Sequence, residues 1–134
     1  MRNSFILIAD DDADDKLLLE TAFQEIGFTG KVKFVSNGEE LTEFLQRLDK
    51  SENPGVIILD LNMPRKTGLE VLKELRSNNN FKNVHIVVFS TTKNETEVQD
   101  CIKLGADSYF VKPINYNALL EFAKSINNVL ISPL

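Results

Sequence analysis

The feature that most constrains the fold of this chain is a repeated alternation of short apolar runs with helix-like segments. The apolar runs are FILIA (5–9), VKFV (32–35), VIILD (56–60), HIVVF (85–89) and SYFV (108–111). At least three of them are nearly continuous, without the alternation of apolar and polar residues that marks a strand with one wet face. Strands that helices cover on both faces have this pattern, so it predicts a parallel sheet.

Apolar residues recur every three or four positions between these runs, as in amphipathic helices. They are Leu18, Ala22 and Ile26, with Leu19 and Phe23 beside them; Leu41, Phe44, Leu45 and Leu48; Leu69, Leu72 and Leu75; Val98, Cys101 and Ile102; and Leu119, Phe122, Ala123, Ile126 and Leu130. We expect Gly27 and Gly30 to close the first helix, SNG (36–38) to open the second, and NPG (53–55) to precede the third strand. The result is a (βα)₅ chain, an open α/β sheet with helices on both faces.

Polar residues able to carry chemistry stand at the predicted strand ends. They are Asp10 and Asp11 after the first strand, Asp60 at the end of the third, Ser90, Thr91 and Thr92 after the fourth, and Lys112 after the fifth. Ligands of open α/β sheets bind beyond the carboxyl ends of the strands. We therefore expect three carboxylates, a cluster of hydroxyls and a lysine to meet at one edge of the sheet.

Three neighbouring carboxylates need a cation, and oxygen donors favour a hard one such as Mg²⁺, which commonly binds carboxylates, waters and a phosphate together. A hydroxyl and an ammonium nearby can hold further phosphoryl oxygens. A carboxylate can itself be the nucleophile and form an aspartyl-phosphate. The residues at the strand ends are therefore suited to Mg²⁺-assisted phosphoryl transfer.

The acidic segment IADDDADD (8–15) divides between two tasks in this interpretation. Asp10 and Asp11 follow the strand without an intervening turn and belong to the cation site. Asp12 suits the N-cap of the first helix, and Asp14 and Asp15 suit its first turn, where the helix dipole favours acids. His85 and Cys101 are expected to be structural: His85 opens a strand, at the end away from the site, and Cys101 lies on the apolar side of its helix.

The ordered set of motifs resembles the receiver domain of two-component response regulators. It comprises DD after the first strand, LDLNMP (59–64) with Gly68 eight residues past Asp60, a hydroxyl residue after the fourth strand, and YFVKP (109–113). The resemblance extends from about Phe5 to Val129. It implies a doubly wound, flavodoxin-like (βα)₅ fold with a five-stranded parallel sheet in the order 2-1-3-4-5, and residues 1–134 as a single receiver domain without an output domain.

The resemblance also implies a metal site around a phosphoacceptor. Asp60 would receive the phosphoryl group from a phosphohistidine. Asp11 would bind Mg²⁺ directly, and Asp10 would bind it directly or through water. The backbone carbonyl of Asn62 would be a further ligand, alongside Asp60.

The remaining roles that it implies concern the phosphoryl oxygens and the switch. Ser90 and Lys112 would contact the phosphoryl group, although a shift of one position would put Thr91 in the place of Ser90. Ser90 and Tyr109 would form the switch pair. A cis peptide bond before Pro113 is frequent in the family and would set the direction of Lys112.

Composition limits the partners and the location. A net charge of −5 and a pI near 4.9 argue against general binding to nucleic acid or to an anionic membrane. No apolar stretch approaches the roughly 20 residues of a membrane helix, and the N-terminus lacks a signal-peptide pattern. The single cysteine suits a reducing compartment. These observations favour a cytoplasmic protein.

The leading hypothesis is a phosphorylation-dependent switch in a phosphorelay, not an enzyme with independent turnover. Its partners would be a histidine kinase or a histidine phosphotransfer protein, and then a target protein or a second copy. The output face would be the fourth helix (98–102), the fifth strand (108–111) and the last helix (119–130), with Val98, Cys101, Tyr109, Tyr116 and Phe122. Loop composition is reminiscent of small receivers paired with phytochrome-like kinases.

Two alternatives remain at this stage. The first is an aspartate-dependent phosphohydrolase, which would need a second acid two residues after its nucleophile, where this chain has Asn62. The second is a pseudo-receiver that binds partners without phosphorylation, although the chain lacks none of the expected site residues.

Overall fold

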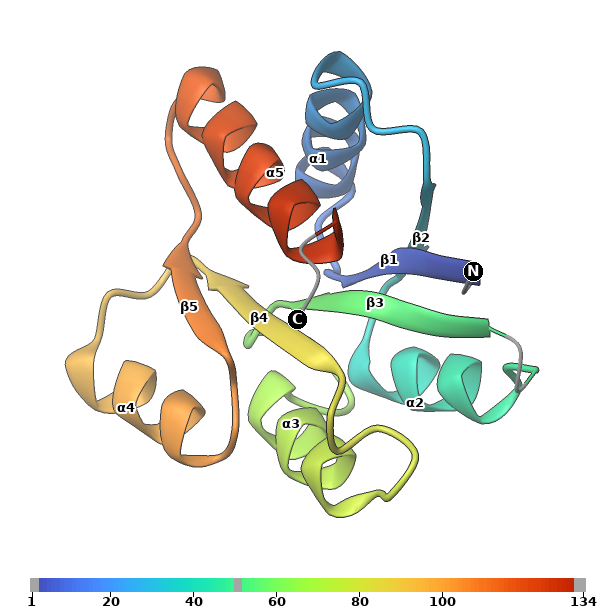
Figure 1. Cartoon of the computed structure of the whole chain (residues 1–134). Coiled ribbons are helices and arrows are strands. Elements are labelled where there is room, and N and C mark those ends of the chain that lie inside the picture. Colours follow the sequence, from blue (N-terminus) through green and yellow to red (C-terminus); the bar gives the residue numbers. More distant parts are fainter. Residues whose placement is uncertain (1–2, 50–51, 132–134) are drawn as a thin grey trace.

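Within residues 3–49 and 52–131, which the computed structural model describes, five parallel strands form one sheet (Figure 1). They are β1 (Asn3–Ala9), β2 (Lys31–Val35), β3 (Glu52–Leu59), β4 (His85–Ser90) and β5 (Ser108–Val111). The strand order is β2-β1-β3-β4-β5, which confirms the order implied by the resemblance. The order reverses beside β1, so the carboxyl ends of β1 and β3 lie at the switch point where open α/β sheets bind ligands.

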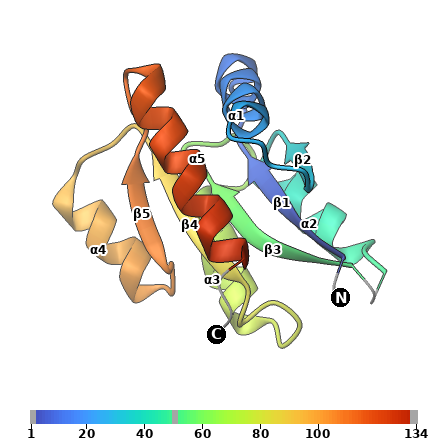
Figure 2. The same ribbon diagram turned by 45° about the horizontal axis from the view of Figure 1, so that its top comes forward.

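Helices cover both faces of this sheet (Figures 1 and 2). They are α1 (Ala13–Glu25), α2 (Gly38–Gln46), α3 (Gly68–Ser77), α4 (Glu95–Lys103) and α5 (Tyr116–Ile131). Helices α1 and α5 lie side by side on one face, and α2, α3 and α4 lie on the other. This arrangement confirms the doubly wound fold.

The sheet separates two hydrophobic cores. Phe5, Leu7 and Ala9 of β1 pack toward α2 and α3, whereas Ile6 and Ile8 pack toward α1 and α5. All five side chains are at most 2% exposed. Alternate residues of one strand thus enter different cores, which is why the central strands are apolar at every position.

The buried face of α1 is turned relative to the predicted one. Leu19, Ala22 and Phe23 are its buried residues, whereas Leu18 is 47% exposed. Ile26 is partly buried against the same core. The prediction that Leu18 lies on the core line was therefore wrong by one position, because the leucine run Leu17–Leu19 supports more than one helical stripe.

Two local predictions, one about the start of the third strand and one about the peptide bond before Pro113, were also wrong. The NPG segment lies inside β3, where Pro54 pairs with Phe5 beside a shift in register between Phe5 and Ile6. Pairing with β1 overrides the turn preference of these residues. Among the described residues no peptide bond is cis, so the cis bond expected before Pro113 is not found.

The helix ends follow local rules. Gly27 follows the C-cap of α1 with a φ of 81°, a conformation that glycine adopts without steric cost. Asn37 of the SNG segment caps α2, since its side chain accepts a hydrogen bond from the Glu40 N–H. None of the described helices is long and apolar enough to span a bilayer.

Candidate functional site

Backbone hydrogen bonds that continue past the strand ends hold the candidate site together. The N–H of Asp10 donates to the carbonyl of Val35 (3.1 Å), and the N–H of Asp60 donates to that of Ala9 (3.0 Å). At the other side, the N–H of Lys112 donates to the carbonyl of Ser90 (2.7 Å). The sheet pattern thus extends one residue further and fixes the backbone from which these side chains project.

Three carboxylates meet at this edge, as predicted. Oxygens of Asp10, Asp11 and Asp60 lie within 4.8 Å of one another. Asp10 and Asp60 are buried, with 1% and 6% exposure, whereas Asp11 is exposed. Each buried carboxylate also accepts a backbone N–H two residues on: Asp12 donates to Asp10 Oδ1 (2.9 Å), and Asn62 donates to Asp60 Oδ1 (3.2 Å).

Lys112 brings one ammonium group into this cluster. Its Nζ donates to Asp10 Oδ2 (2.8 Å) and to Asp60 Oδ2 (3.1 Å), and only 11% of its side chain is exposed. It also donates to Asp15 Oδ2 at 2.7 Å. The first two contacts join the strand ends of β1, β3 and β5, as the sequence predicts.

Burial and charge together shift the pKa values of the site. Burial raises the pKa of the Asp60 carboxyl group, Lys112 opposes the rise, and Asp10 adds to it. Burial alone would lower the pKa of Lys112, but its hydrogen bonds to Asp10 and Asp15 and the nearby charge of Asp60 raise it. Lys112 is therefore a fixed cation at every physiological pH, and Asp60 is a carboxylate whose charge lacks full compensation.

Hydroxyl groups border the acidic cluster on the β4 side. Ser90 is fully buried at the end of β4, whereas Thr91 is exposed. The N–H of Thr92 points to Ser90 Oγ (3.5 Å), and the Tyr109 hydroxyl donates to the carbonyl of Thr92 (2.8 Å). Burial raises the pKa of the Tyr109 phenol, with the adjacent Ser90 hydroxyl opposing the rise. Ser90 and Tyr109 are thus neighbours at the end of the sheet.

Gly68 lets α3 begin directly against the backbone of Asp60. A Cβ atom at this position would lie 2.6 Å from the Asp60 carbonyl oxygen and 2.7 Å from the Leu61 Cα. The N–H of Gly68 donates to the Leu61 carbonyl at 3.1 Å, and Thr67 and Glu70 form a capping box. Helix α3 therefore anchors the loop after Asp60.

The segment Asp10–Asp15 divides between the acidic cluster and the start of α1, as predicted, with one correction. Asp12 is the N-cap of α1, since its carboxylate accepts the N–H groups of Asp14 (2.8 Å) and Asp15 (3.1 Å). The sequence predicts a place for Asp15 only in the first turn of the helix. Its carboxylate instead contacts Lys112, so Asp15 belongs to the site as well.

The donor chemistry of the cluster fits a divalent cation. Its candidate ligands are all oxygens, they lie close enough together that a metal ion could be held among them, and their combined negative charge exceeds the charge of the single ammonium. One carboxylate, that of Asp11, faces solvent, which leaves room for water ligands of the kind that Mg²⁺ retains. The role of the Asn62 carbonyl stays a prediction.

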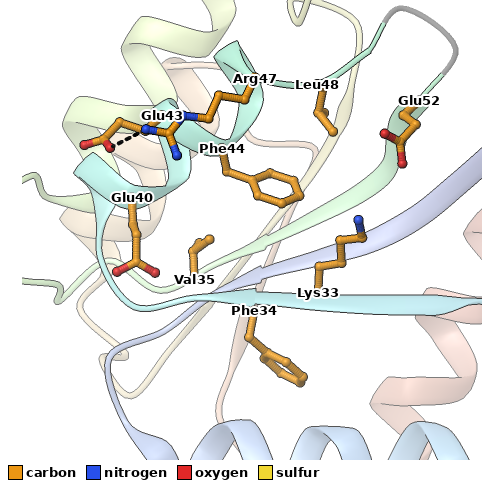
Figure 3. A pocket seen from close by; sticks show the side chains of 9 residues that line it. All are labelled: Lys33, Phe34, Val35, Glu40, Glu43, Phe44, Arg47, Leu48 and Glu52. Carbon is orange, nitrogen blue, oxygen red and sulfur yellow. Dashed lines mark ion pairs between the residues drawn. The ribbon is translucent and has the colours of Figure 1, made fainter.

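A hollow of about 470 Å³ beside β2 and α2 lies apart from this cluster (Figure 3). The ammonium of Lys33 lies 5.2 Å and 5.5 Å from the ring centroids of Phe5 and Phe44, and Arg47 pairs with Glu43. The cations that line this hollow, Lys33 and Arg47, thus already have partners. It contains no residue of the acidic cluster.

The structure places His85 and Cys101 outside the site, in agreement with their predicted structural roles. His85 begins β4, at the opposite end from Ser90, with Nδ1 4.0 Å from Asp107. Cys101 is fully buried in the core beneath α4, and burial raises the pKa of its thiol to about 11. Such a thiol is inert at neutral pH.

Comparison with known proteins identifies the class that this fold and site define. Residues 6–124 match the model of the response regulator receiver domain. The chain therefore belongs to the receiver domain family of two-component signalling, whose members serve as phosphoacceptors.

Individual relatives agree with this assignment. The chain is 29% identical over 116 residues to the chemotaxis protein CheY1 of Helicobacter pylori, covering 87% of this chain and 90% of CheY1. It is 30% identical over 126 residues to the response regulator Rcp1 of Synechocystis sp., covering 92% and 86% of the two chains.

Solved structures extend the similarity to phytochrome response regulators. The Mn²⁺-bound form of Rcp1 superposes with a TM-score of 0.84 at 27% identity, covering 97% of this chain and 96% of that one. The phosphorylated cyanobacterial phytochrome response regulator RcpA gives a TM-score of 0.86 at 30% identity, covering 96% and 94%. These similarities favour a signalling receiver over the phosphohydrolase and pseudo-receiver alternatives.

Proposed function

We propose that Asp60 is the phosphoacceptor of this receiver and that Asp10 and Asp11, with Asp60, hold a Mg²⁺ ion. The observation that carries the proposal is the convergence of these three carboxylates with the ammonium of Lys112 at the switch point of the sheet. The solved Mn²⁺-bound form of Rcp1 supports a divalent cation in a related protein. The Asn62 backbone carbonyl would be a further ligand.

The residues of the site suit an in-line attack by Asp60. One carboxylate oxygen attacks the phosphorus of a phosphohistidine, the P–N bond breaks, and the electron pair leaves with the imidazole nitrogen, producing an aspartyl-phosphate. Lys112 already touches Asp60 Oδ2 and would follow the charge onto the phosphoryl oxygens. A bound Mg²⁺ would neutralise part of the developing charge.

Ser90 and Tyr109 are the proposed link from phosphorylation to the surface. Ser90 is buried beside the acidic cluster, and Tyr109 is half-buried with its hydroxyl held by the Thr92 carbonyl. A phosphoryl group that draws the Ser90 hydroxyl would alter the start of the β4–α4 loop. The Tyr109 hydroxyl is bonded to that loop, so its ring would change position with it.

The proposed output face is α4, β5 and α5. Cys101 and Phe122 on these elements are buried, so they support the face from within and do not contact a partner. Its exposed apolar residues are Ile102 (48%), Val111 (38%) and Ile114 (101%). A target protein or a second copy would cover these side chains, and a histidine kinase, of the phytochrome-linked type, would supply the phosphoryl group in the cytoplasm.

Phosphorylation by a small donor tests the proposal. Incubation with phosphoramidate and Mg²⁺ is expected to add the mass of one phosphoryl group to the wild type and none to Asp60→Asn. When EDTA is present from the start of the reaction, no adduct should form on the wild type. Asp14→Asn is the matched control, because it removes an exposed acid from the same edge. An adduct of equal yield on Asp60→Asn would overturn the assignment, as would a wild type that stays unmodified.

A further inference from the structure

Asp15 makes the shortest of the three contacts of the Lys112 ammonium. Its Oδ2 lies 2.7 Å from Nζ, compared with 2.8 Å for Asp10 and 3.1 Å for Asp60. The Asp15 side chain is 32% exposed, whereas that of Lys112 is 11% exposed. Neither the motif set of the sequence nor the proposed mechanism gives Asp15 a role in the reaction.

The three partners match the three N–H groups of a lysine ammonium. Two partners, Asp10 and Asp15, hold it at close distance from β1 and α1, and the third and longest contact points to Asp60. An ammonium on a four-carbon stem rotates freely unless its other N–H groups are bound. Two firm contacts therefore determine where the third N–H points.

The position of Asp15 is itself well determined. Its N–H donates to the N-cap Asp12 (3.1 Å), which fixes the first turn of α1 directly after the strand end. The ammonium of Lys112 also lies over the ring of Phe89, whose centroid is 5.9 Å from Nζ. Asp15 thus reaches the ammonium from a rigid helix start, across 97 residues of sequence.

We propose that Asp15 is a positioning residue for Lys112, which it holds so that the third N–H points to the Asp60 oxygen where a phosphoryl group is transferred. This inference rests on the proposed function of Asp60 as the phosphoacceptor. On phosphorylation the contact to Asp60 is exchanged for one to a phosphoryl oxygen, while Asp10 and Asp15 keep the ammonium in place. Asp15 does not touch the reacting atoms, so it acts only through Lys112.

The rate of phosphorylation by phosphoramidate at saturating Mg²⁺ tests this role. Asp15→Asn is expected to slow the reaction about tenfold, the lower end of the range for partners that orient a reacting group, because the site is partly open to water. Asp15→Glu restores a carboxylate and is expected to recover part of the rate. Asp14→Asn removes an acid from the same helical turn that has no ion pair among the described residues, and it should stay within about twofold of the wild type.

A second readout reports on Lys112 directly. In the wild type, the ¹⁵N–¹H signal of the Lys112 side chain should be visible at neutral pH, because three hydrogen bonds slow proton exchange. Asp15→Asn should broaden this signal, whereas Asp14→Asn should leave it unchanged. If Asp15 only stabilised the helix, the Lys112 signal would be the same in Asp15→Asn and Asp14→Asn.

Two results would overturn the inference. One is an Asp15→Asn variant with the rate and Lys112 signal of Asp14→Asn. The other is faster phosphorylation of Asp15→Asn, which would mean that Asp15 only repels the anionic donor. Failure of the wild type itself to accept a phosphoryl group would instead contradict the proposed function, so the two failures are distinguishable.

Discussion

Replacing Asp60 with asparagine is expected to stabilise the metal-free protein, because burying the charged Asp60 carboxylate is unfavourable. Oxygens of Asp60 and its neighbours Asp10 and Asp11 lie within 4.8 Å of one another. Two like charges at 4.8 Å repel by about 3.5 kcal/mol at an effective dielectric constant of about 20. Asp60 experiences one such repulsion from the buried Asp10 and a weaker one from Asp11, whose exposed carboxylate is screened by water.

Lys112 offsets this repulsion. At 3.1 Å its attraction for Asp60 amounts to about 5 kcal/mol at the same dielectric constant. The charges around Asp60 therefore roughly balance, and the cost of burying the carboxylate, which is the first cause of its raised pKa, is what disfavours its charged form. Because a neutral asparagine side chain avoids the cost of burying a charge, we expect Asp60→Asn to raise the free energy of unfolding by about 1–2 kcal/mol at pH 7.

The sign of the pH dependence follows from the raised pKa of Asp60. Between its unfolded-state and folded-state pKa values, the folded wild type binds more protons at Asp60 than the unfolded chain. The stability of the wild type relative to Asp60→Asn therefore falls as the pH rises through this window. Below the ordinary carboxyl pKa of about 3.9, Asp60 is neutral in both states and the contribution of its charge disappears.

Urea denaturation followed by circular dichroism, in EDTA, measures this difference. Saturating Mg²⁺ should stabilise the wild type more than Asp60→Asn and close or reverse the gap, because the ion binds the charged cluster. Asp14→Asn serves as the control, since Asp14 lies in the first turn of α1 and its removal should weaken the protein slightly. If the free energy of unfolding of Asp60→Asn at pH 7 in EDTA does not exceed that of the wild type, the reasoning is refuted.

Three further predictions concern packing and local structure. Gly68→Ala should destabilise the fold by about 1–3 kcal/mol in the same urea assay, because the added Cβ atom meets the fixed backbone of Asp60. Gly30→Ala is the control and should cost clearly less, because its added Cβ atom meets only the movable ring of Phe28. Equal losses of stability in the two variants would contradict this prediction. Asp12→Ala should cost about 1 kcal/mol through loss of the α1 cap, and an unchanged urea midpoint would argue against the cap. Cys101, with a thiol pKa of about 11, should resist iodoacetamide at pH 8 until urea is added; rapid labelling of the native protein would contradict its burial.

Much of the fold follows from patterns that are local in the sequence. The central strands are recognisable because both of their faces are buried, so Ile6, Leu7 and Ile8 are all apolar. The N-cap Asp12 follows from residue type and position alone, since its partners lie two and three residues away. The convergence of Asp10, Asp60 and Lys112 follows from one topological rule about strand ends.

The features that escaped prediction depend on partners far along the chain. Asp15 reads as an ordinary first-turn acid because its partner, Lys112, is 97 residues away. The sequence also predicts no special role for Arg76. In the structure its guanidinium donates hydrogen bonds to the Gly105 and Val84 carbonyls and pairs with Asp107, 31 residues away. Secondary-structure propensity and local patterns predict contacts between residues that are close in sequence. Pairs such as Asp15 and Lys112 meet only in the folded chain.

The most direct test of the account is the chemical identity of the phosphorylated residue. After reaction with phosphoramidate and Mg²⁺, borohydride reduces an aspartyl-phosphate to homoserine, and peptide mass spectrometry locates the change. We predict homoserine at position 60 and unmodified aspartates in the segment Asp10–Asp15. Homoserine in that segment, with Asp60 unchanged, would contradict the central claim.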